Sequence, residues 1–159
     1  MRNVKVHKLQ YIIIGLLLSI YYAPSSFACS CVPFDVSKNY EKALFVFEAF
    51  MTKTELINDF NGKVEPWGSS SSFVIGNFVV SKTWKGNPDI LNGVITHNES
   101  SACGLTLSAS RSYIHFIYEI ATNKGLIYDR DYGVVSLCGG PYSGDRDLLE
   151  SIRKWLENK

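Results

Sequence analysis

Four cysteines constrain this chain more than any other feature of its sequence. Cys29 and Cys31 are separated by one residue, whereas Cys103 and Cys138 lie far along the chain. An even number of cysteines in a short chain is typical of a disulfide framework formed in an oxidising compartment. A bridge between Cys29 and Cys31 would close a tight, strained ring, so the residues leave two long-range pairings open.

A basic stub and an apolar run precede the first cysteine. The run of about a dozen apolar residues is too short for a spanning helix and is typical of a secretory signal peptide. Ser26 and Ala28 frame a cleavage site with small residues. We therefore expect residues 1–28 to be removed, leaving Cys29 as the first residue of a secreted or periplasmic protein.

Lipid anchoring through Cys29 is the alternative for this junction. Lipidated cysteines usually have leucine three residues before them, where this chain has Ser26. Lipidation would also consume one thiol and leave three cysteines, an odd number for an oxidising compartment. We therefore prefer simple cleavage.

The mature chain, residues 29–159, has the length of one domain with its own core. Its basic residues are scattered and the formal charge of the whole chain is +1, so neither a nucleic-acid footprint nor a polybasic membrane patch is visible. We expect a single-domain monomer that binds no nucleic acid and has no membrane span after processing.

Alternating apolar patterns predict a mainly β fold with about five closely spaced strands, which favours a small closed or nearly closed barrel. Gly76, inside one strand, is interpreted as a bulge. Residues 58–72 are rich in turn formers and predict a long exposed loop. The strand-like stretches are residues 44–56, 72–86, 94–97, 112–121 and two short segments within 125–140.

Two helices are predicted, one near each end of the mature chain. Residues 35–45 predict a short helix with Asp35 or Ser37 as its cap. Residues 143–159 predict an amphipathic helix, capped by Asp145 or Ser143, whose apolar face we expect to dock on the core. That face consists of Leu148, Leu149, Ile152, Trp155 and Leu156.

The sequence predicts neither an enzyme, nor a cofactor, nor a metal site in the free protein. Paired cysteines leave no thiol nucleophile, and the serines at 70–72 lack the G-x-S-x-G setting. His97 and His115 have no zinc-type spacing with cysteine or with each other. Four carboxylates are explained by turns and by a helix start, namely Asp129, Asp131, Asp145 and Asp147.

A set of short motifs spans nearly the whole mature chain in a characteristic order. Together they resemble the netrin-like domain of the tissue inhibitors of metalloproteinases (TIMP-like family) in its short bacterial single-domain form. The motifs are CSCVP at 29–33, KALFVFEAFM at 42–51, SKTWKG at 81–86, ACGL at 102–105, SYIHFIYE at 112–119 and SLCGG at 136–140.

This resemblance implies a five-stranded OB-type barrel with flanking helices. It also implies the disulfides Cys29–Cys103 and Cys31–Cys138. In the inhibitors of this family, the free α-amine and carbonyl oxygen of the N-terminal cysteine chelate the catalytic zinc of a metalloprotease. Carried over, Cys29 is the chelating residue and Ser30 enters the pocket beside the zinc.

The residues that follow, Cys31, Val32 and Pro33, would form the supporting N-terminal ridge. The chain departs from the animal inhibitors, which carry three disulfides in this domain and usually a second cysteine-rich domain. A non-inhibitory interaction module that binds a protein or a glycan, with the loop at 58–72 as a contact surface, is therefore the alternative. In that case Cys29 and Cys31 serve as a staple.

Overall fold

The computed structural model describes residues 31, 33–58, 60–61, 72–98, 104–124, 129–136, 138–139 and 146–159. The expected signal peptide lies outside these residues, as do Cys29, Ser30, Val32 and Cys103. No helix among the described residues is long and apolar enough to span a bilayer.

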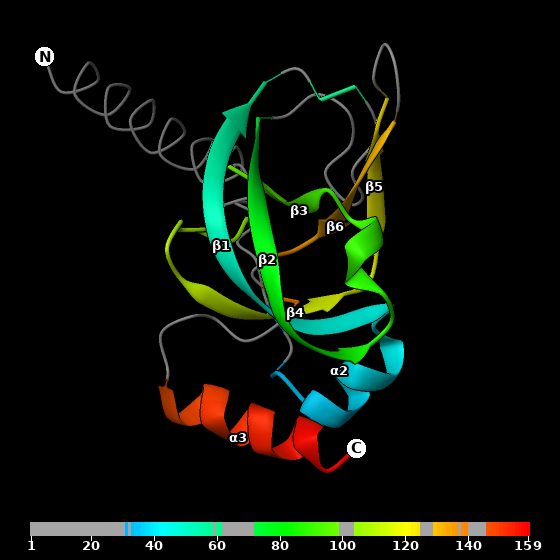
Figure 1. Ribbon diagram of the computed structural model, residues 1–159, viewed down its shortest axis with the longest axis vertical. Coiled ribbons are helices and arrows are strands. Elements are labelled where there is room, and N and C mark those ends of the chain that lie inside the picture. Colours follow the sequence, from blue (N-terminus) through cyan, green and yellow to red (C-terminus); the bar gives the residue numbers. More distant parts are fainter. Residues whose placement is uncertain are drawn as a thin grey trace, which may run out of the picture.

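The described fold is mainly β, as the alternating sequence pattern predicts (Figure 1). The helices are α2 (Val36–Lys42) and α3 (Arg146–Glu157), with a short 3₁₀-helix, η1 (Pro88–Ile90), between β2 and β3. The strands are β1 (Phe45–Ile57), β2 (Phe73–Lys85), β3 (Gly93–His97), β4 (Ser112–Ile117), β5 (Ile120–Asn123) and β6 (Arg130–Val134).

The strands form one sheet in the order β4-β1-β2-β3-β6-β5. All neighbours are antiparallel except β3 and β6, which are parallel. The two edge strands, β4 and β5, follow one another in the sequence. Before the break between them, the Leu44 N–H donates to the Ile117 carbonyl (2.7 Å); after it, the Val134 N–H donates to the Glu119 carbonyl (2.9 Å). Residues 112–123 therefore pair first with β1 and then with β6.

This change of partner divides one predicted strand into β4 and β5, while of the two short strands predicted within residues 125–140 the described residues contain one, β6. The sequence predicts residues 112–121 as one strand, because aromatic and β-branched residues continue through it without a turn signal. In the structure the strand is interrupted at Tyr118 and Glu119, where its hydrogen bonds pass from one neighbour to another. The paired strands of the described residues accordingly form an open six-stranded sheet.

Gly76 does not mark a bulge, so that prediction is wrong. It pairs in register with Thr54, and the nearest irregularity lies in β1 between Met51 and Lys53. A Cβ atom on Gly76 would overlap the Met51 methyl group and come within 3.3 Å of Leu107 Cδ1. The glycine leaves room for the Met51 and Leu107 side chains that pack over it.

Buried side chains cover both faces of the sheet. On one face Phe47, Met51 and Ile117 belong to a core cluster with strand neighbours and the segment 104–107. On the other face Val46 joins residues of β4, α2 and α3 in a second cluster. Figure 1 shows both helices at the same end of the sheet, next to β4. The helices therefore supply the layer that buries the outer side of β1 and β4.

Helix α3 docks on the core through four of the five residues of the predicted face, whereas Leu148, the fifth, is exposed. Ile152 and Leu156 are buried, and Leu149 and Trp155 pack against the same cluster. Both expected caps, Asp145 and Ser143, lie outside the described residues. Burial of a large apolar side chain contributes roughly 1.5–3 kcal/mol, so these contacts are the main attachment of α3 to the sheet.

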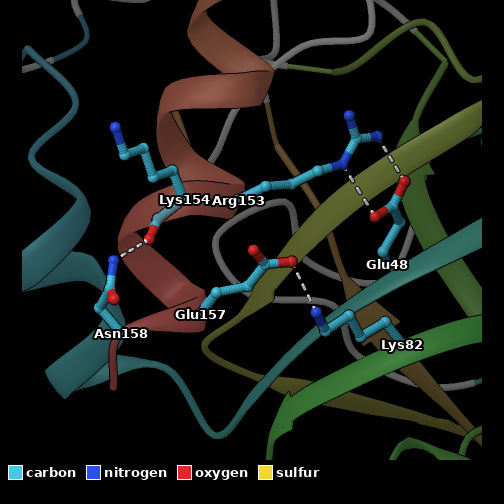
Figure 2. A network of polar contacts seen from close by, with 6 residues as sticks. All are labelled: Glu48, Lys82, Arg153, Lys154, Glu157 and Asn158. Atoms are coloured by element: carbon cyan, nitrogen blue, oxygen red, sulfur yellow. Dashed lines mark hydrogen bonds and ion pairs between the residues drawn. The ribbon is translucent and has the colours of Figure 1, made fainter.

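Two ion pairs accompany this apolar contact and join α3 to the strands. In Figure 2, Arg153 and Glu157 extend from α3 to Glu48 on β1 and Lys82 on β2. The Arg153 guanidinium donates to both Glu48 oxygens, at 3.0 and 2.5 Å, whereas Lys82 makes one bond of 2.7 Å to Glu157.

The Trp84-Lys85-Gly86 turn holds α2 against the sheet. The Lys85 ammonium donates to the carbonyls of Tyr40 (2.7 Å) and Glu41 (3.0 Å) in the last turn of α2, where a cation is favoured. The Tyr40 hydroxyl donates to the Trp84 carbonyl (3.1 Å). Gly86 has a φ of 74°, and a Cβ there would lie 2.6 Å from a backbone oxygen. This motif thus serves the fold.

The two ion pairs of α3 should differ in strength, because the Glu48 side chain is 15% exposed and Glu157 is 54% exposed. Arg153→Met leaves a nearly buried carboxylate without its bidentate partner and should lower the free energy of unfolding by about 1–2 kcal/mol. Lys82→Met, the matched control, should cost less than about 1 kcal/mol. Urea unfolding of both variants measures this, and equal losses would contradict the ranking.

Candidate functional site

The N-terminal end of the described chain is crosslinked to the end of β6. Cys31 and Cys138 form a disulfide that spans 107 residues and brings their Cα atoms to 5.0 Å. It is one of the two bridges that the resemblance implies. Cys138 lies in a turn just after β6, closed by a hydrogen bond from the Gly139 N–H to the Ser136 carbonyl (3.0 Å). Both cysteines are exposed, so the bridge lies at the surface.

The residues between Cys31 and α2 are anchored at a second point. Phe34 packs edge-on against Phe116 of β4, with ring centroids 5.2 Å apart. Asp35 then caps α2 by accepting from the N–H groups of Ser37 (3.1 Å) and Lys38 (3.2 Å), as the sequence predicts. The chain is therefore anchored at Cys31 by the disulfide and at Phe34 by packing, and Pro33 between these two residues is exposed.

The segment after Cys103 is held close to the turn that carries Cys138. The Leu105 N–H donates to Thr96 Oγ1 on β3 (2.8 Å), and Leu105 packs against the core. Leu105 also lines a small cavity of about 20 Å³ together with Ser136 and Gly139, which flank Cys138. Leu105, two residues after Cys103, and Ser136, two residues before Cys138, therefore line the same cavity.

His115 lies at the same cavity and is an aromatic-packed core residue. Its side chain is 3% exposed and stands among the rings of Phe47, Tyr113 and Phe78, at centroid distances of 5.1, 5.8 and 6.3 Å. Its Nε2 has no hydrogen-bond partner among the described residues. Burial lowers the pKa of His115 from 6.5 to about 4, because the apolar surroundings disfavour the charged ring.

The other polar candidates have structural partners. His97, at the end of β3, packs edge-on against Phe73 at 5.7 Å. Asp131 accepts a hydrogen bond of 2.6 Å from the Thr122 hydroxyl and joins β5 to β6. Within the part of the chain that the structure describes, no group of three or more His, Cys, Asp and Glu side chains is placed to hold a metal.

A hollow that the sequence did not indicate lies beside the second half of β1. This hollow, the β1 hollow, has a volume of about 440 Å³. It is lined by Thr54 and Leu56 of β1, Val74 of β2, His97 and residues 104–107. Its origin is a difference in strand length, since β1 has 13 residues and β4 has 6. The sequence predicted strands of more similar length, residues 44–56 and 112–121, and therefore did not indicate the hollow.

The chain matches no protein-family model, and no curated protein matches it.

The Cys31–Cys138 bridge should stabilise the fold chiefly by restricting the unfolded chain. For a loop of 107 residues, the chain-entropy relation gives roughly 4–5 kcal/mol. A Cys31→Ser/Cys138→Ser double variant should therefore unfold at a markedly lower urea concentration than the parent. A double variant with unchanged stability would show that the bridge does not constrain the unfolded chain.

His115 should make the protein less stable in acid. Because its pKa is about 4 when folded and 6.5 when unfolded, the unfolded chain binds more protons between these values. The free energy of unfolding should fall by about 3 kcal/mol as the pH drops from 6.5 to 4. His115→Phe, which suits the surrounding rings, should remove this component. Urea unfolding at several pH values compares the two slopes, and identical slopes would contradict the assignment.

Proposed function

We propose that the chain is an exported TIMP-like protein that inhibits a zinc metalloprotease through its N-terminal Cys29. The observation that carries the proposal is the Cys31–Cys138 bridge, which fixes the chain two residues after Cys29. Export as a secreted or periplasmic protein belongs to the same proposal, since the chelating amine exists only after cleavage behind Ala28.

The proposed fold is an OB-type barrel of five strands, with residues 112–123 as one bent strand. Three features of the sheet support this. The edge strands β4 and β5 are consecutive, the segment bonds to β1 and then to β6, and β3 pairs with β6 in parallel. If β4 and β5 are counted as one strand, that strand has β1 on one side and β6 on the other, and the five strands form a closed ring.

The proposal requires a second bridge, Cys29–Cys103. Leu105 lines the same cavity as Ser136 and Gly139, so the chain after Cys103 runs close to Cys138. Cys29 lies two residues before Cys31, a span of at most about 7 Å for an extended chain. These distances favour a Cys29 side chain within reach of Cys103.

Such an end has the chemistry that a catalytic zinc accepts. The zinc of a metalloprotease keeps one coordination position for water or substrate. An α-amine with a pKa of about 8 deprotonates readily and can bind there together with its own carbonyl oxygen. Two crosslinks order the end before binding, so that less of the binding free energy is lost on immobilisation. Ser30 would then enter the adjoining pocket, with Cys31, Val32 and Pro33 as the ridge behind it.

A non-inhibitory interaction module is the second candidate, and the β1 hollow favours it. This concave surface lies among residues that the chelation mechanism does not use. The loop at 58–72, the other surface proposed for this role, lies largely outside the described residues.

One added residue separates the two candidates. Protein that begins at Cys29 should inhibit at least one member of a panel of zinc metalloproteases, whereas protein with an additional Ala before Cys29 should lose at least a hundredfold in inhibition constant. The reason is that the added peptide bond removes the free amine from the chelating residue. Circular dichroism and thermal unfolding should show the same fold for both. Absence of inhibition by both forms would remove the inhibitor proposal.

A further inference from the structure

His115 is a buried histidine with a polar ring atom that the described fold does not use. The side chain is 3% exposed, and its Nε2 atom has no hydrogen-bond partner among the described residues. Buried polar atoms without a partner are rare in native proteins, because the interaction with water that is lost on burial is not replaced. Packing alone would be served equally well by phenylalanine, so the histidine calls for another explanation.

The surroundings of His115 offer nothing that would stabilise a positive charge. On the sheet the ring is faced by Phe47 of β1, Phe78 of β2 and Tyr113 of β4. Across the cavity it meets Leu105, Val135, Ser136 and Gly139. Among these described residues Tyr113 is the one titratable group, and its hydroxyl accepts a hydrogen bond from the Ser108 N–H (3.0 Å). A protonated His115 ring is therefore driven towards any conformation in which it reaches water.

The turn around Cys138, here called the Cys138 turn, is the least firmly attached wall of this cavity. Its described residues are 136, 138 and 139. By contrast, β4 pairs with β1 along its whole length, and the Leu105 N–H bonds to Thr96 of β3. Within the turn the Gly139 N–H donates to the Ser136 carbonyl (3.0 Å), and these turn residues make no other hydrogen bond to the described part of the chain. Opening of the turn breaks no strand pairing, so it is the least costly way to expose the ring.

We propose that His115 is a pH-sensitive switch beneath the Cys138 turn: the neutral ring lets the turn close against β4, and protonation of the ring opens it. Because Cys138 carries the crosslink to Cys31, the N-terminal segment loosens when the turn opens. A partner of this segment would therefore meet a fixed chain end at neutral pH and a looser one in acid. The switch uses no atom of Cys29, so the inference goes beyond the proposed inhibition and does not depend on it.

The size of the effect follows from the difference in pKa between the two forms. The ring titrates at about 4 when the turn is closed over it, and a ring that reaches water has the ordinary pKa of 6.5. The open form binds more protons between these values and gains on the closed form as the pH falls. The equilibrium constant for opening should therefore rise about 50-fold from pH 7 to pH 4.5.

Amide hydrogen exchange, measured by NMR on disulfide-intact protein that begins at Cys29, tests the switch at Gly139. The protection factor of Gly139, which corrects for the intrinsic pH dependence of exchange, should fall about 50-fold from pH 7 to pH 4.5. Low concentrations of urea should change this exchange little, because a local opening exposes little surface. Met51, whose N–H bonds to the Arg111 carbonyl in the sheet, should instead follow global unfolding and respond strongly to urea.

Two histidine variants identify the group that titrates. His115→Phe should abolish the response of Gly139 to acid. The matched control is His97→Phe, because His97 is also buried (7% exposed) but does not line this cavity, and it should keep the response of the parent. The urea comparison uses the parent alone, so it holds whether or not His115→Phe folds. A protection factor at Gly139 that is absent or independent of pH, an unchanged response in His115→Phe, or equal urea dependence at Gly139 and Met51 would overturn the switch.

Discussion

The exchange of partners along residues 112–123 is the constraint on which the rest of the structure depends. By pairing with β1 before Tyr118 and with β6 after Glu119, this segment links the two edges of the sheet through a single stretch of chain. The exchange brings β6, and the Cys138 turn behind it, to the region where the chain enters through Cys31. The crosslink therefore joins parts of the chain that the sheet has already brought together.

The local patterns of the sequence predicted the elements well, and the non-local contacts less well. Alternation identified β1 and β2, and the spacing of Ile152, Trp155 and Leu156 identified α3 and its buried face, because these signals depend on neighbouring residues. The break at Tyr118 left no such signal, since strand-forming residues lie on both sides of it without a turn former, while the hydrogen-bond partners of the chain change. Gly76 was misread for a related reason: a glycine that leaves room for Met51 on the adjacent strand looks the same in sequence as one that bends its own strand.

For the site, the residues alone left two long-range cysteine pairings open, and the family resemblance selected the one to which Cys31–Cys138 belongs. Another motif behind that resemblance, Trp84-Lys85-Gly86, turns out to hold α2 on the sheet. Its presence therefore reflects the architecture, and an inhibitory role must come from the chain end itself. The β1 hollow depends on where β4 stops, which is a property of the assembled sheet.

We propose that Cys29 of the processed chain is a free chain end held by two crosslinks. Mass spectrometry of the natively exported protein, intact and after digestion without reduction, tests it most directly. We expect a chain that begins at an unmodified Cys29 and contains Cys29–Cys103 and Cys31–Cys138 as its disulfides. A lipid or acyl group on Cys29, a different first residue, or a free thiol at Cys29 or Cys103 would contradict it.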